Sequence, residues 1–436
     1  MIARAETMVD VLRSFELRGA AGGARAGEQG ELWGEPGGFP VEKKVAPSRT
    51  ETIEVAGRPI PRIHNELWTA RQRQGHSLHE ISYRACFKAE LPAFFIERLT
   101  AKGDRVLDPF LGRGTTTIEA GLRGRVPVGS DLNPLCPLLV EPRLAPPRLP
   151  EIEERLAEIP WGKGEDAGID LSMFYHPETL AKITALRRYL RERREAGRED
   201  SIDRWIRLVA INRLSGHSRG FFSVYTMPPN QAVGPEKQRE LNARRGQEPP
   251  ARDVAELVLR KSKSLLRSLR EEQRARLRVA HARGTITEGP ADRLAGVAEG
   301  SVALTVTSPP FVDVVDYARD NWLRCWFAEI DAEGVRERLT TPRKLDDWAG
   351  AMGAVLRELY RVTRIGGWVA FEVGEVRGGK LPLDEIVAPL GVEAGLDCVA
   401  IAVHTQEFTK TANCWGVANN SKGTNTNRVV LFRRRL

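Results

Sequence analysis

The sequence has little cysteine and no long hydrophobic run. Its five cysteines among 436 residues are dispersed, without a Cys-x-x-Cys pair or histidines at zinc-ligand spacing, so neither a disulfide framework nor a metal centre is expected. No segment approaches the roughly 18 apolar residues of a membrane span. A signal-peptide pattern is also lacking, because Asp10, Arg13 and Glu16 interrupt the N-terminal apolar residues. We therefore expect a cytoplasmic protein that binds no metal and enters no membrane.

Positive charge is plentiful and unevenly placed. The formal net charge of +8 favours a polyanionic partner such as nucleic acid, with arginine that only keeps the surface solvated as an equal alternative. Between Lys182 and Arg278 there are 24 Lys and Arg against 12 Asp and Glu, a surplus larger than that of the whole chain. The basicity is thus concentrated in one stretch.

The chain divides into three parts by pattern. Residues 1–52 include a Gly- and Ala-rich stretch that can bury little surface, so we expect a flexible arm. Residues 53–140 and 284–436 alternate strand and helix patterns and end in two strands that form a closing pair. Residues 141–283 are basic and mainly helical by pattern. These features predict a doubly wound α/β sheet interrupted by one basic helical insertion.

A glycine turn follows the first strand of the sheet. The segment VLDPFLGRGTT passes from a strand ending at Asp108 through Gly112 and Gly114 into a helix. Such a turn presents backbone N–H groups to a ligand, and Asp131, at the end of the next strand, can bind a ribose diol. A nucleoside-containing cofactor is favoured over a plain tight turn. A nicotinamide dinucleotide is less favoured, because Thr117 replaces the third glycine of the GxGxxG fingerprint.

A Pro-Pro loop follows another apolar strand, VALTV. The loop reads Thr307-Ser308-Pro309-Pro310-Phe311. Proline has no N–H, so the loop carbonyls are expected to remain free as acceptors beside the Ser308 hydroxyl. Accepting both hydrogens of an exocyclic amine frees its lone pair for attack, and Phe311 could stack on a base taken out of a duplex. A strand terminator with a core phenylalanine is the plain alternative.

Together, DPFLGRGTT and TSPPF resemble the cofactor and catalytic motifs of the DNA amino-methyltransferases, which modify cytosine N4 or adenine N6. ISYRACFKAELPAFFIERL before the first motif and LYRVTRIGGWVAFEV after the second also resemble that family, so the likeness covers about residues 77–140 and 284–436. The resemblance implies a methyltransferase-type α/β sheet, mostly parallel with an antiparallel last strand. It also implies S-adenosyl-L-methionine as the cofactor.

The resemblance assigns individual site residues. The cofactor-binding residues it implies are Asp108, whose charge would attract the cationic end of the cofactor, with Pro109, Phe110, Gly112, Gly114, Thr115, Asp131, Glu90 and Pro92. The catalytic residues it implies are Ser308, Pro309, Pro310 and Phe311. Asp292 is a weaker match near the adenine, because EGPAD departs from the commoner GDA form.

An insertion between the two motifs resembles the target-recognition region of one subgroup. Its basic surplus would supply salt-dependent phosphate contacts, for which the arginines of residues 187–194 are candidates. The individual residues expected to contact DNA are Arg213, His217, Arg219, Phe222, Tyr225, Asn230, Asp316 and Tyr317. A solvated helical face with ordinary core aromatic side chains is the alternative for each of them.

The acceptor base is only partly indicated. Methylation at cytosine C5 is disfavoured, because it needs a cysteine nucleophile and no cysteine here follows a proline. In the family, Ser before Pro-Pro resembles the cytosine N4 enzymes, so cytosine N4 is favoured over adenine N6. An RNA base amine and a non-catalytic DNA-binding role remain alternatives. We expect DNA as the partner and a nucleoid-associated protein, while a restriction endonuclease or defence-system partner and the oligomeric state stay open.

Overall fold

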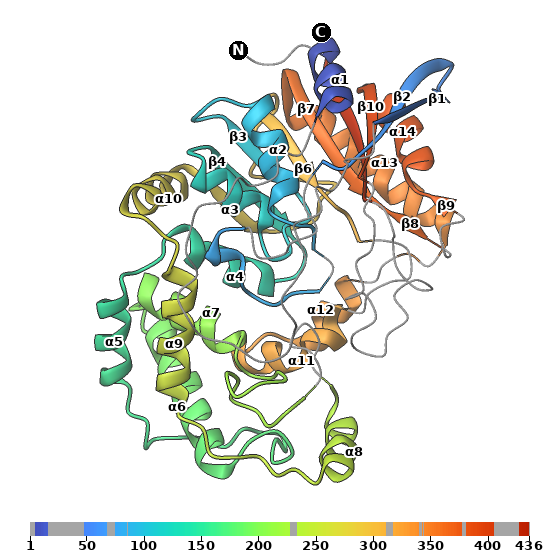
Figure 1. The fold of residues 1–436 in the computed structure, drawn as a ribbon. Helices are drawn as coiled ribbons and strands as arrows, with labels where there is room; N and C mark the ends of the chain where they lie inside the picture. The colour runs from blue at the N-terminus through green and yellow to red at the C-terminus, as the bar shows by residue number, and fades with distance from the viewer. Residues whose placement is uncertain are drawn as a thin grey trace, which may run out of the picture.

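The computed structural model describes residues 5–15, 48–67, 75–84, 86–226, 233–310, 317–339, 342, 344–376, 381–404 and 427–435. Its centre is a sheet with the order β1-β2-β10-β11-β7-β6-β3-β4-β5 (Figure 1). The strands are β1 Arg49–Val55, β2 Arg58–Asn65, β3 Arg105–Asp108, β4 Val126–Asp131, β5 Thr285–Glu288, β6 Val302–Thr307, β7 Thr363–Val373, β10 Asp397–His404 and β11 Asn427–Arg433. A separate small hairpin joins β8 Glu375–Val376 to β9 Leu381–Pro382.

Helices cover the sheet and form the insertion. Around the sheet lie α1 Ala5–Ser14, η1 Ser77–His79, α2 Glu90–Leu99, α3 Thr115–Leu122, α4 Leu135–Leu144, α13 Leu345–Val362 and α14 Asp384–Glu393. The helices α11 Tyr317–Ala328 and α12 Ala332–Arg338 lie beside the insertion, where α11 contacts α7 (Figure 1). The insertion contains α5 Leu149–Glu158, α6 Pro177–Glu195, α7 Ser201–Ile211, α8 Pro235–Arg245, α9 Val254–Leu266 and α10 Glu271–Arg283. Within the described ranges, no helix combines the length and apolarity needed to cross a bilayer.

The sheet has the predicted topology. β5, β4, β3, β6 and β7 pair with one another in parallel, and the last strand, β11, lies antiparallel between β7 and β10. From β3 the chain proceeds outward to β4 and β5, whereas β6 returns to the other side of β3 and leads to β7. Ligands of doubly wound sheets bind where the strand order reverses in this way. The glycine turn and the Pro-Pro loop follow β3 and β6, so they leave adjacent strands at that point.

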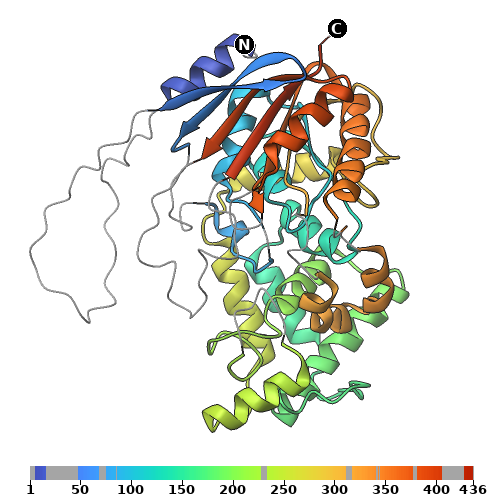
Figure 2. The ribbon, with the colours of Figure 1, turned by 90° about the vertical axis from the view of Figure 1, so that its right-hand side faces the viewer.

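Alternating strand residues supply two hydrophobic clusters. On one face, Val106 and Leu304 belong to the cluster that contains residues of α1 and α2. On the other face, Leu107 and Phe371 belong to the cluster that contains residues of α13 and α14. Side chains of a strand point to opposite faces in turn, which is why neighbours such as Val106 and Leu107 enter different clusters. The sheet is therefore covered on both sides (Figure 2).

The prediction of a flexible arm over residues 1–52 is wrong where the structure describes it. Residues 5–14 form α1, whose Met8 and Leu12 are buried with α2 in the first cluster. Their spacing of four residues puts both side chains on one helix face. Asn65 also fastens the helix end, because its Nδ2 donates to the Leu12 carbonyl at 3.1 Å. β1 begins at Arg49 and pairs with β2, which extends the sheet beside β10; residues 16–47 lie outside the described ranges.

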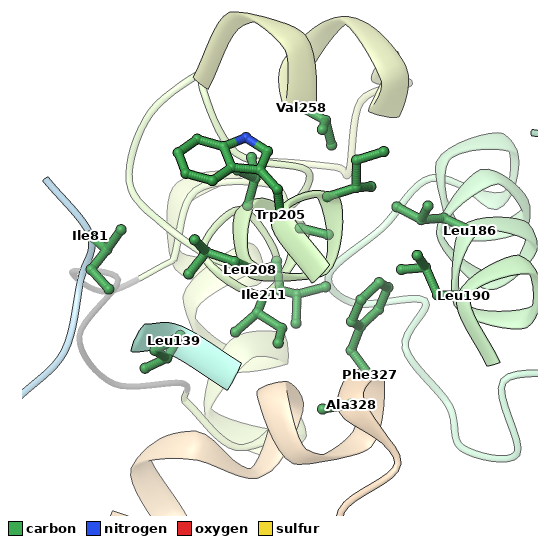
Figure 3. Packing of buried hydrophobic residues seen from close by; sticks show 14 of the residues in the cluster. Ile81, Leu139, Leu186, Leu190, Trp205, Leu208, Ile211, Val258, Phe327 and Ala328 are labelled. Carbon is green, nitrogen blue, oxygen red and sulfur yellow. The ribbon is translucent and has the colours of Figure 1, made fainter. Parts of the chain in front are cut away.

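The insertion is mainly helical, as its pattern predicted, and shares a core with the sheet domain. Trp205 of α7 is fully buried, and its Nε1 donates to Ser262 Oγ at 3.0 Å. Figure 3 shows side chains of α6 and α9 gathered around α7, together with Leu139 of α4 and Phe327 of α11. Since α4 follows β4 and α11 follows the Pro-Pro loop in the chain, the insertion packs directly on elements next to both motif loops.

Candidate active site

A cavity of about 270 Å³ lies at the carboxyl ends of β3, β4 and β6. Predicted site residues in its lining are Pro109, Phe110, Gly112, Asp131, Ser308 and Pro310, together with Asp292, the weaker match. The remaining lining includes Tyr83, Arg338, Leu339, Trp348, Met352 and Val355. The glycine turn and the Pro-Pro loop, far apart in the sequence, therefore face one shared cavity.

Asp131 holds the glycine turn in the cavity wall. Its Oδ2 accepts a hydrogen bond from the Gly112 backbone N at 2.8 Å, and its Oδ1 accepts from the Asn133 backbone N at 2.9 Å. Burial raises the pKa of this carboxyl, and the two backbone donors oppose that rise. A carboxylate with fixed orientation at the end of the second strand is the group that a ribose diol would meet.

Asp108 lies beneath the cavity rather than in its lining. It is 1% exposed, and its Oδ1 accepts from Thr307 Oγ1 at 2.7 Å and from the Phe110 backbone N at 3.2 Å. Burial raises its pKa to about 7. In this position Asp108 ties the end of β3 to the end of β6, so its contribution to a cofactor site runs through the loops that it joins.

Gly114 and Thr115 also stand outside the cavity lining. Gly114 has φ +73°, and a Cβ on it would lie 2.4 Å from Val140 Cγ2 of α4. The close approach of α4 is therefore sufficient to require glycine at this position. Thr115 is buried, and its Oγ1 accepts from Arg113 Nε at 3.3 Å.

This packing argument predicts the effect of Gly114→Ala. We expect the free energy of unfolding to fall by about 2–4 kcal/mol, because the new methyl group both overpacks the α4 contact and strains a left-handed residue. Urea denaturation measures the change. Gly57→Ala is the matched control, since Gly57 has φ +75° but no heavy atom within 4 Å of the added Cβ. Equal losses in the two variants would contradict the packing argument.

One backbone carbonyl of the Pro-Pro loop already accepts a hydrogen bond from within the protein. Trp348 Nε1 of α13 donates to the Pro310 carbonyl at 2.9 Å. The prediction that all carbonyls of this loop remain free is therefore wrong for Pro310. Ser308 lines the cavity, and its hydroxyl is the polar side-chain group of the described part of this loop. Pro309 is buried, and Phe311 lies outside the described residues.

Sequence reasoning overlooks Glu372, which the structure puts behind Ser308. Glu372 is near the end of β7 and is 5% exposed. Its carboxylate hydrogen-bonds the Ser308 side chain, and its Oε1 accepts from Asn427 Nδ2 at 2.9 Å. Burial raises its pKa to about 7, and both hydrogen bonds oppose that rise. The available signal was a lone acid in the apolar strand WVAFEV, where a carboxyl must find partners.

Two further predicted cofactor residues lie at the start of α2. Pro92 is buried, and Glu90 Oε1 is buried without a hydrogen-bond partner among the described residues. A buried carboxylate oxygen without a donor is costly unless a ligand supplies one. The segment before α2 also contacts the glycine turn, because Arg113 Nη2 donates to the Phe87 carbonyl at 3.5 Å. This chemistry fits a cationic amino group, although neither residue lines the cavity.

The predicted DNA-contacting residues are not all accessible. Phe222 is 0% exposed within the core of the insertion, so its assignment to DNA is wrong. Its backbone N donates to the Arg213 carbonyl at 2.8 Å. Asn230 and Asp316 lie outside the described residues, and only the backbone of Tyr317, the first residue of α11, is described.

Other members of that set lie at or near the surface. The Arg213 guanidinium stacks over the Phe221 ring at 4.0 Å, with His217 on the same ring at 6.3 Å between centroids. Arg219 is exposed. Tyr225 is half-buried under the Arg245 guanidinium, which lies 3.9 Å from its ring centre. Stacked arginines of this kind are held in fixed positions, which suits them to a planar or anionic partner.

The arginines of residues 187–194 are poor candidates for phosphate contacts. Arg191 binds Glu165 at 2.7 Å and Glu329 at 3.1 Å. Arg187 reaches the same two carboxylates, and Arg193 binds the buried Asp203 at 2.6 Å. These pairs fasten α6 to its neighbours, which a count of charges along the sequence cannot reveal. The structure therefore corrects the expectation for this segment.

Comparison with known proteins bears on these observations. A family model described as DNA methylase matches residues 41–137, which include the glycine turn. The Type II methyltransferase M.BsoBI of Geobacillus stearothermophilus is 22% identical over 312 residues, covering 63% of this chain and 57% of that protein. The Type II methyltransferase M.MjaII of Methanocaldococcus jannaschii is 32% identical over 74 residues, covering 17% of this chain and 14% of that protein. The chain thus matches little more than half the length of these relatives at most.

Solved structures resemble this chain only loosely. The Thermus thermophilus protein TTHA0409, a proposed DNA modification methylase solved with S-adenosyl-L-methionine, is 21% identical to this chain. The match covers 34% of this chain and 52% of TTHA0409, with a TM-score of 0.22. The rRNA methyltransferase aviRa of Streptomyces viridochromogenes is 14% identical to this chain. The match covers 83% of this chain and 91% of aviRa, with a TM-score of 0.33. Because these scores are low, the fold class rests on the strand order described above.

The family assignment combines these findings with the geometry. The two motifs that resemble the DNA amino-methyltransferases follow adjacent strands and line one cavity. The DNA methylase model matches the region of the first motif, and the match to M.BsoBI extends over most of the chain. The DNA methylase model over residues 41–137 and the similarity to M.BsoBI thus support the S-adenosyl-L-methionine-dependent DNA amino-methyltransferase family for this chain.

Proposed function

We propose that this protein transfers the methyl group of S-adenosyl-L-methionine to an exocyclic amino nitrogen of a DNA base, with cytosine N4 as the favoured acceptor. The observation that carries the proposal is the shared cavity, which Asp131 and Ser308 line from two different loops. The hydrogen bond of 2.7 Å between Thr307 Oγ1 and Asp108 Oδ1 joins the end of β6 to the start of the glycine turn, and Asp131 binds the Gly112 backbone N of that turn. A carboxylate suited to ribose and a hydroxyl suited to an amine thus lie in one site.

The cofactor would be held by residues of the glycine turn, of the end of β4, of α2 and of α13. Asp131 would accept hydrogen bonds from the ribose hydroxyls, while Phe110 and Met352 offer apolar surface to the adenine. Glu90, with its unsatisfied Oε1, would accept from the ammonium group of the methionine end. When bound, the cofactor supplies an electrophilic methyl group on a cationic sulfur.

At the acceptor base, Ser308 would accept a hydrogen bond from the amine. The lone pair of an exocyclic amine is conjugated with the ring, and accepting its hydrogens favours the tetrahedral nitrogen that attacks. The base must leave the duplex to reach a site at the sheet edge, and Phe311 is the proposed stacking partner for it. A serine in front of the two prolines is the feature that favours cytosine N4.

DNA binding is proposed for a basic cluster within residues 141–283, the proposed target-recognition region. The cluster is made of Arg213, Arg219, Arg252, Arg260 and Lys261. Burial and then the charges of Arg219 and Arg260 lower the pKa of Arg252. Burial and then the charge of Arg213 lower the pKa of Lys261 to about 8. Cations that destabilise one another in the free protein gain most from a bound phosphate.

The basic cluster is connected to the cavity by residues 80–83. Lys261 Nζ donates to the Glu80 carbonyl at 2.6 Å, and the Ser82 backbone N donates to Asn212 Oδ1 at 3.0 Å. The next residue, Tyr83, lines the cavity. A DNA strand that contacts the basic cluster would therefore lie beside the segment that forms one wall of the site.

Removing two charges of the basic cluster should weaken DNA binding in a salt-dependent way. For Arg219→Ala combined with Arg252→Ala, we expect the slope of log affinity against log salt to become shallower by about 1–2, because each lost phosphate contact removes about 0.9. Fluorescence anisotropy from low to high salt measures this. Lys237→Ala with Arg239→Ala is the control, since both side chains are exposed and paired with carboxylates. Identical slopes in the two double variants would remove the basic cluster from the interface.

The activity itself is tested by incubating DNA and RNA with methyl-labelled cofactor and analysing the nucleosides by mass spectrometry. The expected product is N4-methylated deoxycytidine. N6-methylated deoxyadenosine would instead establish the adenine alternative, and label in RNA alone would establish an RNA enzyme. DNA binding without label would indicate a non-catalytic protein. Single-molecule sequencing of the product DNA then maps the target site.

A further inference from the structure

The two hydroxyl residues at the end of β6 bind two buried carboxyls on the flanking strands. Thr307 donates to Asp108 of β3 at 2.7 Å. Ser308 donates to Glu372 of β7. The Thr307 bond joins the loops, whereas the Ser308 bond engages the side chain that faces the cavity. Glu372 therefore acts directly on the group that would meet the substrate amine.

The strand residues next to Glu372 are apolar and form no hydrogen bond with its carboxyl through their side chains. Ala370, Phe371 and Val373, the adjacent residues of β7, are all buried. Asn427 of β11 supplies the second hydrogen bond at 2.9 Å. Keeping an ionisable group in such a strand costs free energy, and groups placed this way beside a cavity are often there for chemistry.

We propose that Glu372 orients Ser308 as a hydrogen-bond acceptor and receives, through the Ser308 hydroxyl, the proton that the methylated amine releases. The proposal rests on the proposed function. Glu372 acts through Ser308 and does not line the cavity, so it is a positioning and proton-accepting residue.

The orienting role follows from the chemistry of a hydroxyl, which both donates and accepts. A freely rotating Ser308 could donate its hydrogen to the amine lone pair and so block the attack. When that hydrogen is given to the Glu372 carboxylate, the lone pairs of Ser308 Oγ remain for the N–H groups of the amine. The carboxylate thereby gives a neutral serine the acceptor character that a carboxylate or amide would have in its place.

The proton-accepting role balances the reaction. Methyl transfer forms one N–C bond, breaks the methyl–sulfur bond, and leaves the electron pair of that bond on sulfur. The amine nitrogen gains one positive charge and must lose one proton. That proton moves to Ser308 Oγ while the hydroxyl proton of Ser308 moves to Glu372, which becomes a neutral acid. After product release the acid returns its proton to solvent through Ser308 and the cavity.

The surrounding groups leave Glu372 free to titrate near neutrality. Burial raises its pKa to about 7, so the carboxylate that accepts protons is present above that pH and lost below it. Across β6 the nearest acid is Asp108, with a pKa also raised to about 7 by burial. On β10, His404 pairs with Asn427 in register, and burial followed by the charge of Lys88 lowers its pKa to about 3. Arg428 of β11 is engaged by the buried Asp384 at 3.3 Å.

A titration of the free protein tests the contact without any turnover. In ¹³C-glutamate NMR, the signal that disappears in Glu372→Gln identifies the residue, and we expect it to titrate near pH 7. In Ser308→Ala its midpoint should rise, because the lost hydrogen bond had stabilised the carboxylate. Asn427→Ala should raise it as well. A midpoint that Ser308→Ala leaves unchanged would overturn the proposal.

The kinetic consequence is a changed pH profile. In single-turnover assays the wild-type rate should rise through pH 7, as the carboxylate forms. Glu372→Gln keeps the shape of the side chain but cannot take up a proton, so we expect the rate at pH 8 to fall about 100-fold and the rise to disappear. Glu372→Asp should restore part of the rate and the rise. A merely structural role would scale the profile without changing its shape.

The controls separate this inference from the proposed function. Cofactor affinity, measured by calorimetry across the same pH range, reports the titration of Asp108 and should be alike in wild type and Glu372→Gln. If the wild type methylates DNA and Glu372→Gln has an unaltered rate and profile, the role of Glu372 is refuted and the proposed function stands. If the wild type transfers no methyl group, the proposed function fails, and the NMR titration still decides whether Glu372 controls Ser308.

Discussion

Ser308→Ala should lower the turnover number by about 100–1,000-fold while cofactor affinity stays within about twofold of wild type. The variant loses one preorganised hydrogen bond to the reacting nitrogen. That bond forms only as the amine becomes tetrahedral, so its loss lowers the rate of methyl transfer. Ser308 lines the cavity, and the Tyr83 hydroxyl, the other one among the described lining residues, already accepts from Asn133 Nδ2 at 3.3 Å. Steady-state methylation of DNA gives the turnover number, and calorimetry gives the cofactor affinity.

Ser301→Ala serves as the control for removing a hydroxyl from this part of the chain. Ser301 precedes β6, and its Oγ donates to the Ala298 carbonyl at 2.7 Å, away from the cavity. We expect its turnover to equal that of wild type. If Ser308→Ala also turned over at the wild-type rate, the assignment of the Pro-Pro loop as the catalytic loop would be refuted.

Asp131→Ala should weaken cofactor binding by about 100-fold or more. The variant removes the acceptor of two ribose hydroxyls. A hydrogen bond to a charged group contributes about 1.5–3 kcal/mol, and about 1.4 kcal/mol corresponds to a tenfold change in affinity. It also leaves the Gly112 and Asn133 backbone N–H groups without their acceptor, which loosens the glycine turn. Calorimetry with the cofactor measures the affinity, and thermal unfolding checks that the variant is folded.

Asp292→Ala provides the comparison, because Asp292 lines the same cavity and carries the same charge. We expect at most a tenfold loss of affinity, since no backbone N–H of the glycine turn depends on it. Equal losses for the two variants would mean that the overall negative charge of the cavity, rather than the ribose acceptor, controls cofactor binding.

The sequence predicted the parts of the site that depend on strand order. The motifs at Asp108 and Ser308 each follow an apolar strand, and in a doubly wound sheet such strands bring their carboxyl ends to one edge. The structure confirms the mostly parallel sheet and its antiparallel last strand. The closing strand pair and the helical character of the insertion follow from the same hydrophobic periodicity.

Contacts between distant segments could not be predicted. Gly114 looks like a ligand-contacting glycine until Val140 is found 2.4 Å from its notional Cβ. Arg191 looks like a phosphate contact until Glu165 and Glu329 are found on its guanidinium. Phe222 lies in a polar loop and is nevertheless buried. In each case the deciding partner is remote in the sequence, so composition and spacing carry no trace of it.

The shared core around Trp205 limits how this protein could be re-engineered. Exchanging residues 141–283 for the corresponding segment of a relative would leave Leu139 and Phe327 facing a surface they were not packed against. A functional chimera would have to carry α4 and α11 along with the donor segment. Because α4 starts just beyond Asp131 and α11 starts just beyond the Pro-Pro loop, such a graft also moves both cavity walls, so the insertion cannot be exchanged as an independent module.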